Sequence, residues 1–396
     1  MYVDHRLALR KGELAGALEQ VCQALELTGT QEKRAEGHYT AVGEWLAESD
    51  DPMLQGVAIY VQGSTALGTT VRPLGRDEHD VDLVCFVPEL GSYMPPAFLK
   101  ARIGARLRQS GRYDSMLEEK PRCWRLNYAG EFHMDITPAI TNPACDRGGE
   151  LVPDKKLRTW KSTNPRSYRA LFEARAKLQP RMRLFKGGLA EDRSAQASVE
   201  PYPSPMATKG ILRRAVQLAK RNRDVHFAKA DPSLAPISVI ITTLAARSYA
   251  YCVASFEFDS ELDLLQSIIR FMPVFIEKQP GGAGGVQWHI PNETTAGENF
   301  AEKWNADPTL AMAFFEWHSR FSADLDRLVS LAGLDQLTKS LAASFGSVPA
   351  QAALDALTGG VSDARASGRL SIAPSVGLTV GAGVGSPMRR NTFYGA

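Results

Sequence analysis

The sequence lacks paired-cysteine motifs and long apolar runs, and it has no excess of either charge. Its five cysteines are scattered, with no CxxC pair and no histidine at zinc-ligand spacing, so neither structural zinc nor disulfides are expected. No stretch approaches the roughly 18 apolar residues of a membrane span. The N-terminal MYVDHRLALRKGEL also lacks the apolar core of a signal peptide. These absences predict a cytoplasmic protein that does not associate with membranes.

The charge balance bears on the class of partner. Lys and Arg total 46 against 44 Asp and Glu, for a net charge of +2, so no global positive field favours binding to long nucleic acid. Any nucleotide must therefore be bound locally. With 44% hydrophobic and 23% charged residues in 396, the chain has an ordinary globular composition and room for one or two domains.

Helical and strand patterns alternate in the first half, which predicts an α+β fold. Thr28 and Gln31 have capping-box spacing before a long amphipathic helix. VAIYVQG (57–63) and DVDLVCFV (80–87) are expected to be strands, followed by a basic helix around 101–109. Two further strands are expected, CWRLNYA and EFHMDITPAI, the second of them ending at Pro138.

The second half has mostly helical apolar spacing, from Thr208 to near Leu341. QPGGAGG lacks the strand-then-helix context of a dinucleotide fingerprint and is interpreted as a plain loop. After about Thr358 the composition becomes rich in glycine, serine and alanine, which is typical of disorder. The expected organisation is a core over 1–180, a mobile connecting loop over 181–206, a helical lobe over 207–345 and a flexible tail over 346–396.

Two carboxylates stand at the start of the apolar strand DVDLVCFV. Asp80 and Asp82 share one face because side chains alternate along a strand, and buried acids require a cationic partner. Hard oxygen ligands select magnesium or manganese, and a site for two such ions needs a third carboxylate, for which Asp135 is the candidate. The alternative for a single DxD is a pair of solvated acids on an exposed edge. GSTALG (63–68), where a strand ends and a short helix begins, offers backbone N–H groups suited to phosphate.

Together these motifs resemble the DNA polymerase β-like nucleotidyltransferases, and more narrowly the cGAS/DncV-like group of bacterial anti-phage signalling systems. Similar segments in bacterial members of the group are LVPDKKLRTWKSTNP, RRAVQLAKRNRDVHF, PISVIITTLAA and ENFAEKW. The resemblance spans about Tyr39 to Leu334. It implies a nucleotidyltransferase core with a mixed sheet, a C-terminal helical lobe, and nucleoside triphosphates bound in the cleft between them.

The resemblance also implies roles for residues at the matching positions. Gly63 and Ser64 would hold donor phosphates, and Asp80 and Asp82 would bind two Mg²⁺ ions, with Mn²⁺ as a substitute. Asp135 would hold the ion that lowers the pKa of the acceptor hydroxyl. All five residues are present.

Further residues have both a ligand-binding and a structural interpretation. Lys220 and Ser238 match triphosphate-binding positions of the group. Lys220 also fits a solvated helix face with Arg213 and Gln217, and Ser238, which follows Pro236, also fits a simple helix cap. Asn164, with Trp160 before it, is a candidate base contact, although a buried tryptophan beside a turn explains the segment equally well.

By this resemblance the protein is an enzyme that condenses nucleoside triphosphates, ATP among them, into a cyclic di- or trinucleotide messenger for a downstream effector protein, with release of pyrophosphate. One alternative is a linear transferase acting on RNA, protein or a small molecule, and the near-neutral charge argues against long RNA. Another is a catalytically silent nucleotide-binding scaffold, against which the intact carboxylates count. The end of the chain, NTFYGA, resembles substrates of ubiquitin-activating-like conjugating enzymes, which would join Ala396 to a target; plain disorder is the alternative.

Overall fold

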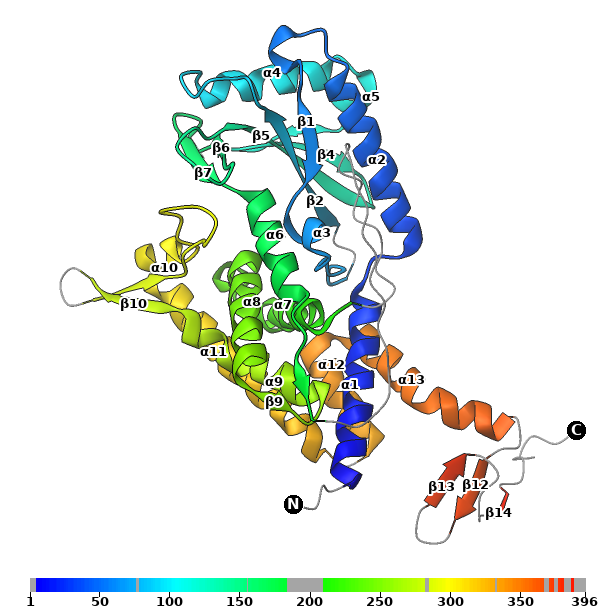
Figure 1. The fold of residues 1–396 in the computed structure, drawn as a ribbon. Coiled ribbons are helices and arrows are strands. Elements are labelled where there is room, and N and C mark those ends of the chain that lie inside the picture. Colours follow the sequence, from blue (N-terminus) through cyan, green and yellow to red (C-terminus); the bar gives the residue numbers. More distant parts are fainter. Residues whose placement is uncertain are drawn as a thin grey trace, which may run out of the picture.

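The computed structural model describes residues 5–75, 78–154, 156–183, 209–281, 285–331, 333–366, 370–373, 377–380 and 386–387. Figure 1 shows a lobe built around a β-sheet and a second lobe made of helices, with the N-terminal helix running along the second. This is the α+β architecture expected from the sequence. Within the described ranges, no helix is both long and apolar enough to cross a membrane.

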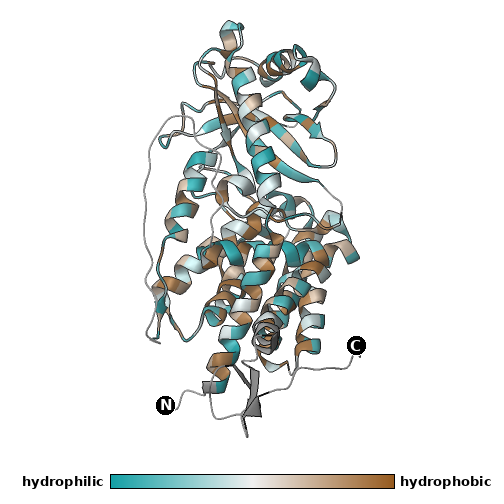
Figure 2. Cartoon of the chain, turned by 90° about the vertical axis from the view of Figure 1, so that its right-hand side faces the viewer, coloured by the Kyte–Doolittle hydropathy of each residue, from teal (hydrophilic) through white to brown (hydrophobic). Residues whose placement is uncertain are grey.

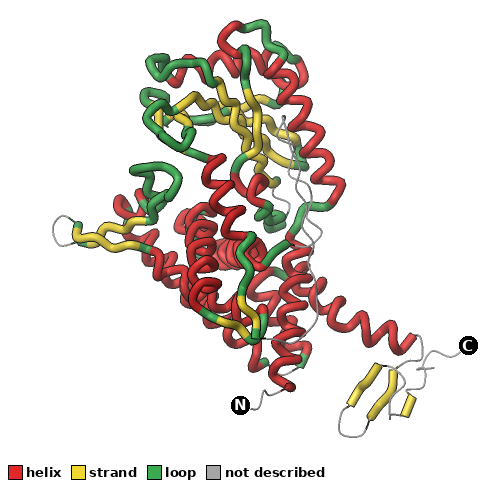
Figure 3. Tube along the Cα trace, in the orientation of Figure 1, coloured by secondary structure: helices red, strands yellow, loops and turns green. Residues whose placement is uncertain are grey.

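One mixed sheet organises the first lobe (Figure 3). Its strands follow the order β1–β2–β5–β4–β3, and β6 extends it from β5 to β7. The central pair, β2 and β5, is parallel and the other pairs are antiparallel. The strand bounds are β1 Ala58–Val61, β2 His79–Val87, β3 Leu117–Glu119, β4 Trp124–Tyr128, β5 Phe132–Thr141, β6 Glu150–Pro153 and β7 Trp160–Thr163.

The two faces of β2 have different environments, as its alternating sequence predicts. Val81, Leu83 and Cys85 are fully buried in a core shared with α2 (Gly29–Ala47) and α4 (Pro96–Arg108). The capping box of Thr28 and Gln31 is formed at the start of α2. The opposite face of β2 carries Asp80, which is exposed, and Asp82, which is half-buried. Burial of one face thus presents the carboxylates on the other.

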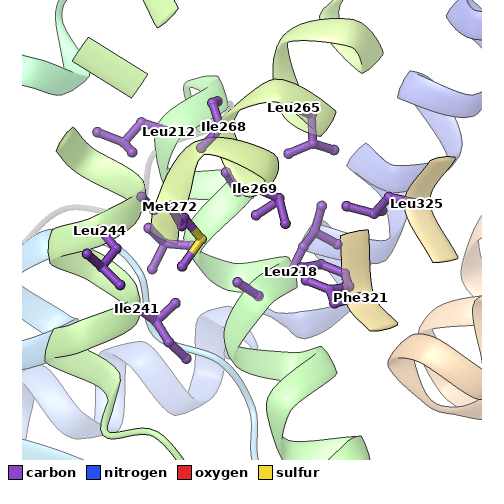
Figure 4. Close-up of a cluster of buried hydrophobic side chains, with 14 of the residues drawn as sticks. Leu212, Leu218, Ile241, Leu244, Leu265, Ile268, Ile269, Met272, Phe321 and Leu325 are labelled. Atoms are coloured by element: carbon purple, nitrogen blue, oxygen red, sulfur yellow. The ribbon is translucent and has the colours of Figure 1, made fainter. Parts of the chain in front are cut away.

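The second lobe is a helical bundle. Hydrophobic side chains from α7, α8, α9 and α11 point toward one another in Figure 4, among them Leu218, Ile241, Ile269 and Phe321. Its helices also carry hydrophilic residues, so the lobe is a mixture of brown and teal in Figure 2. The helix bounds are α7 Ile211–Lys229, α8 Ser238–Ser255, α9 Glu261–Phe271, α10 Glu302–Ala306, α11 Pro308–Arg327 and α12 Leu334–Phe345.

Short elements complete the described chain. They are α3 Gly63–Leu67, α5 Gly111–Asp114, α6 Pro165–Ala176, β8 Arg181–Met182, β9 Glu257–Phe258, β10 Glu277–Pro280, β11 Val286–His289, β12 Leu370–Ala373, β13 Gly377–Val380 and β14 Ser386–Pro387. The first two residues of QPGGAGG end β10, which pairs with β11 in antiparallel fashion. The described residues of QPGGAGG therefore lie between two paired strands and do not lead into a helix, as a dinucleotide fingerprint would require.

Both ends of the chain differ from the expected division into lobes. The N-terminal helix α1 (His5–Leu25) buries Leu14, Leu18 and Val21 in the core of the helical lobe, whereas the sequence pattern places all of 1–180 in the sheet lobe. Residues 347–366, expected to begin a flexible tail, form helix α13 (Ser347–Ala366). Ala350 and Ala353 of α13 are fully buried in the same core. Alanine is the best helix former, and its small side chain allows close helix packing, so this part of the predicted tail is helical.

The strand predicted to end at Pro138 continues to Thr141. Proline has no N–H to donate, so it is disfavoured between two hydrogen-bonded neighbours. The pairing of β4 with β5 ends at Ile136, which leaves Pro138 paired only with Cys85 of β2. The proline is tolerated because the sheet is locally one strand narrower.

Candidate active site

The three predicted carboxylates lie together on two adjacent strands. Asp82 of β2 is directly opposite Asp135 of β5, and Asp80 is opposite His133. The side chain of Asp80 is 57% exposed and that of Asp135 is 17% exposed, so the group opens to solvent at one side. The parallel pairing of β2 and β5 therefore produces the carboxylate cluster that the motif spacing predicted.

Gly63 brings the backbone of α3 against Asp82. Its φ angle is +65°, and a Cβ added there would lie 2.4 Å from Oδ2 of Asp82. The neighbouring Gln62 N–H donates to the carbonyl of Asp82 over 2.8 Å. Only glycine fits this position, because it accepts the left-handed conformation and has no side-chain atom to collide with the carboxylate.

The electrostatic environment of Asp82 favours a bound cation. Burial of the carboxyl group raises the pKa of Asp82 to about 7, with the charges of Asp135 and Asp80 acting in the same direction, while Arg125 and Lys220 lower it. A carboxyl with a raised pKa resists ionisation unless positive charge is added nearby. The donor set consists of hard carboxylate oxygens, which fit Mg²⁺ or Mn²⁺.

Arg125 of β4 was not identified by sequence analysis. It lies opposite Asp135 in the sheet. Its Nε donates to Oδ1 of Asp135 over 2.6 Å and its Nη2 donates to Oδ2 over 2.8 Å, while the same Nη2 reaches Asp80 at 3.3 Å. Within the described part of the chain, no three acidic, histidine or cysteine side chains are arranged as metal ligands. Asp135 and Asp80 are hydrogen-bonded to Arg125 instead.

A pocket of about 200 Å³ is lined by Gly63, the residue that lies against Asp82, although none of the three aspartates lines the pocket. It is lined by all five of the residues predicted to bind nucleotide, namely Gly63, Ser64, Asn164, Lys220 and Ser238. These residues come from the sheet lobe, from the start of α6 and from two helices of the helical lobe. The fold thus brings to one cavity residues that lie up to 175 positions apart (Gly63 to Ser238).

Lys220 is buried, so the alternative interpretation, a solvated helix face, is wrong. The residue is only 4% exposed, and its Nζ donates to the hydroxyl and carbonyl oxygens of Thr69 over 3.0 and 3.1 Å. Burial lowers the pKa of Lys220 to about 7. On the same stripe, Arg213 and Gln217 donate to the carbonyls of Leu67 and Thr70. The polar stripe of α7 therefore joins the helical lobe to the loop after α3.

Ser238 is the first residue of α8, but it is not the helix cap. The cap position is Ile237, and no side chain caps the helix there. Pro236 lies one residue before the cap, so it is not at the first helical position. The hydroxyl of Ser238 accepts a hydrogen bond from Arg223 over 3.1 Å and lines the pocket. A capping role is therefore excluded, and the hydroxyl is available to a ligand beside a cationic side chain.

Asn164 has a structural role in addition to its place in the pocket. It is the N-cap of α6, where Oδ1 accepts from the Ser167 N–H over 3.0 Å and Nδ2 donates to the Arg147 carbonyl over 3.2 Å. Trp160 donates to the Met94 carbonyl and packs on the sheet core. Both the oxygen and the nitrogen of the Asn164 side-chain amide are thus hydrogen-bonded within the protein. Its contact with a base stays a prediction.

Other pocket residues escaped sequence analysis. They include Tyr168, Thr242, Asn292, Glu298 and Phe300. Thr242 lies one helical turn after Ser238, and a periodicity argument from that serine would have found it. Glu298 and Phe300 belong to ENFAEKW, which carried part of the family resemblance but suggested no role. Ala396 lies outside the described residues.

Gly63→Ala is expected to impair both folding stability and nucleotide transfer, because the new methyl group meets the Asp82 carboxylate. Thermal melting and initial-rate assays would measure the two effects. Gly75→Ala is the matched control, since Gly75 has a φ of +72° but no atom from elsewhere in the described chain lies within 4 Å of an added Cβ. The control should melt lower through backbone strain and retain activity. Equal activity loss in both variants would contradict a specific conflict with Asp82.

Comparisons with known proteins, by sequence and by structure, agree on the kind of protein to which this chain is similar. Residues 13–175 match the family described as Second Messenger Oligonucleotide or Dinucleotide Synthetase domain. A "c-di-GMP synthase" of Roseivirga ehrenbergii is 30% identical over 97% of this chain and 98% of its own length. The solved CdnG of Bradyrhizobium diazoefficiens, in complex with GTP, has a TM-score of 0.65 at 21% identity, covering 86% of this chain and 97% of that one. Vibrio cholerae DncV, a cyclic AMP-GMP synthase, has a TM-score of 0.53 at 16% identity, with 88% and 89% covered.

Proposed function

Because this chain belongs to the cGAS/DncV-like nucleotidyltransferases, which synthesise cyclic oligonucleotides, we propose that its own reaction joins two GTP molecules into cyclic di-GMP. The full-length relative that is 30% identical bears the name c-di-GMP synthase, which supports guanine as the base. The observation that carries the proposal is the pocket lined by both lobes, whose lining residue Gly63 lies against Asp82 of the carboxylate cluster. The family resemblance seen in the sequence also implies that ATP is a substrate. The test below therefore compares ATP with GTP.

The proposed chemistry consists of two phosphoryl-transfer steps. In the first, a ribose hydroxyl of one GTP attacks the α-phosphorus of the other, a P–O bond forms, and the bond to pyrophosphate breaks. The second step repeats this within the linear intermediate and closes the ring, and each attacking hydroxyl loses its proton. Such reactions depend on positioning and charge neutralisation more than on a covalent enzyme intermediate.

Individual residues have defined tasks in this proposal. Asp80, Asp82 and Asp135 would hold two Mg²⁺ ions, which supply charge neutralisation at the reacting phosphate and lower the pKa of the attacking hydroxyl. Gly63 permits the α3 backbone to lie close to Asp82, where Ser64 can contact phosphate. Lys220 and Ser238 would bind the remaining phosphates from the helical lobe. Since Arg125 neutralises Asp135 and Asp80, it must give way for a metal ion to use them.

The decisive experiment supplies the purified protein with each radiolabelled triphosphate, alone and in mixtures, together with Mg²⁺ or Mn²⁺. Phosphatase treatment then distinguishes a cyclic product, which has no terminal phosphate, from a linear one. We expect a phosphatase-resistant product from GTP alone. A product that is wholly degraded would indicate linear transfer, and failure to turn over any triphosphate would indicate a nucleotide-binding scaffold.

Ser238→Ala is expected to raise the KM for the triphosphate severalfold while changing kcat little, because the hydroxyl is proposed to contact phosphates away from the reacting centre. Its thermal midpoint should stay close to that of the parent, since Ser238 does not cap α8. Ser267→Ala is the control: its hydroxyl donates to the Asp263 carbonyl within α9, away from the pocket. An unchanged KM for Ser238→Ala would remove this serine from the binding site.

The biological setting belongs to the same proposal. Signalling in anti-phage defence would require an effector protein that recognises the cyclic product in the cytoplasm. A solved relative, CdnC of Escherichia coli, forms a complex with a HORMA protein, an observation that concerns CdnC alone.

Conjugation of Ala396 by a ubiquitin-activating-like enzyme remains a prediction. Deletion of residues 393–396 should remove such an adduct from cells and leave nucleotide synthesis intact.

A further inference from the structure

Among the described residues that line the pocket, Glu298 is the one whose charge opposes triphosphate binding. Lys220, Ser238, Ser64 and Gly63 offer a cation, hydroxyls and backbone to phosphate, whereas a carboxylate in the same cavity repels it. Burial also raises the pKa of Glu298, so holding its charge there is unfavourable without a hydrogen-bond donor. Glu298 is therefore suited to a part of the ligand that carries N–H groups.

The carboxylate of Glu298 is held in place and only partly satisfied. Nδ2 of Asn292 donates to Oε2 of Glu298 over 2.7 Å, and the Asn292 N–H donates to the Glu298 carbonyl over 2.9 Å. Across the described residues, no hydrogen bond reaches the second carboxylate oxygen, Oε1. Glu298 thus keeps acceptor capacity on a side chain whose position is set by Asn292.

The loop that carries Glu298 is anchored to the helices that form the pocket walls. Arg175 of α6 makes a bidentate ion pair with Glu293 over 2.7 and 2.8 Å. Arg247 of α8 donates to the same carboxylate and to the Pro291 carbonyl. A recognition group mounted on a fixed loop loses little conformational freedom when the ligand binds, which favours selective recognition.

Aromatic side chains complete this end of the pocket. Tyr168 and Phe300 meet edge to face with ring centroids 6.1 Å apart, and both line the cavity. The Tyr168 hydroxyl is hydrogen-bonded to the Thr243 hydroxyl over 2.8 Å. This hydrogen bond fixes the orientation of the ring. A flat heterocycle can stack on such rings, since base–aromatic stacking tolerates any base. Stacking alone would not select among the bases.

We propose that Glu298 selects guanine, by accepting hydrogen bonds from N1–H and the 2-amino group of the base. Adenine presents a lone pair at N1 and has no 2-amino group, so the same carboxylate repels it. This inference rests on the proposed function, in which GTP is the substrate. A two-bond contact of this kind discriminates about tenfold or more against the wrong base.

The test measures calorimetric binding of non-hydrolysable analogues of GTP, ITP and ATP to the parent protein and to Glu298→Gln. ITP lacks the 2-amino group, so it isolates one of the two proposed hydrogen bonds. The parent should prefer the GTP analogue to both others by about tenfold or more. Glu298→Gln should lose about tenfold in GTP affinity, gain or retain ATP affinity, and bind GTP and ITP nearly equally.

Glu302→Gln is the matched control. Glu302 begins α10 a few residues further on, its side chain is 77% exposed, and it pairs with Lys161 at 3.6 Å outside the pocket. It should bind all three analogues as the parent does. Glu298→Asp retains the charge on a shorter arm and should keep part of the guanine preference, which provides a second measurement should Glu298→Gln fold poorly.

The outcomes separate this inference from the proposed function. A Glu298→Gln protein that keeps the parent's ratio of GTP to ATP affinity overturns the role of Glu298, even if cyclic di-GMP is made. A parent that prefers ATP overturns both the role and the choice of GTP. A parent that prefers GTP through Glu298 but makes only linear product supports base selection and contradicts cyclic synthesis.

Discussion

Asp82→Asn should abolish nucleotide transfer while leaving the fold intact. Asp82 of β2 lies opposite Asp135 of β5, and the substitution removes one of these two negative charges. A neutral amide cannot hold a divalent ion as a carboxylate does. In the metal-free protein the same change removes an unfavourable charge, because burial raises the pKa of Asp82 to about 7. Thermal stability without metal should therefore be equal to that of the parent or higher.

The measurement combines product formation at saturating Mg²⁺ with thermal melting in a chelator. We expect turnover to fall by about a thousandfold or more, in line with the loss of charge stabilisation at a reacting centre. The exposed Asp50→Asn, in the same lobe, is the control and should behave as the parent does. Near-normal turnover of Asp82→Asn at saturating Mg²⁺ would exclude Asp82 as a metal ligand, and a large loss of stability would assign it a structural role instead.

Much of the sheet lobe was predictable because its signals are local. The capping box before α2, the alternation along β2 and the glycine at the start of α3 each depend on residues a few positions apart. The candidates Asp80, Asp82 and Asp135 followed from strand alternation and the cost of burying acids, and the resemblance to a known family then implied their separate roles. Membership of that family and the α+β fold are both confirmed, whereas the separate roles of the site residues still require the experiments above.

What could not be predicted depends on contacts between distant segments. A polar stripe on α7 was visible in the sequence, but periodicity does not reveal whether such a stripe faces water or another lobe. Here it faces the loop after α3, where Lys220 bonds to Thr69, so the solvated-face interpretation failed. In the same way, the alanines at 350 and 353 are buried in the core of the helical lobe, where α1 and α12 pack against α13.

Arg125 shows the same limitation within a single sheet. An arginine in the strand CWRLNYA is typical of a solvated strand face, and nothing in the local sequence links it to Asp135. The link is the antiparallel register of β4 and β5, which pairs Arg125 with Asp135. On its other side, Asp135 is paired with Asp82 of β2. This register places a guanidinium where the family resemblance alone had suggested only metal ions.

Arg125→Gln is expected to destabilise the metal-free protein and to increase its response to Mg²⁺. The substitution removes the bidentate contact of 2.6 and 2.8 Å to Asp135 and the 3.3 Å contact to Asp80. With Arg125 and Asp135 mostly buried, the free energy of unfolding in a chelator should fall by about 1 to 3 kcal/mol. Because Asp135 and Asp80 are then no longer neutralised by the protein, added Mg²⁺ should raise the thermal midpoint more than it does in the parent.

Thermal melting across a magnesium series, with Mn²⁺ binding followed by electron paramagnetic resonance, measures this effect without relying on activity. Arg34→Gln is the control, since Arg34 pairs with Glu131 over 2.5 Å on the surface of the same lobe. An exposed pair contributes about 1 kcal/mol at most, and its loss should leave the response to metal unchanged. If Arg125→Gln and the parent have the same metal affinity and the same magnesium-dependent rise in thermal midpoint, Arg125 does not compete with metal. Its contact with Asp135 would then serve the stability of the sheet alone.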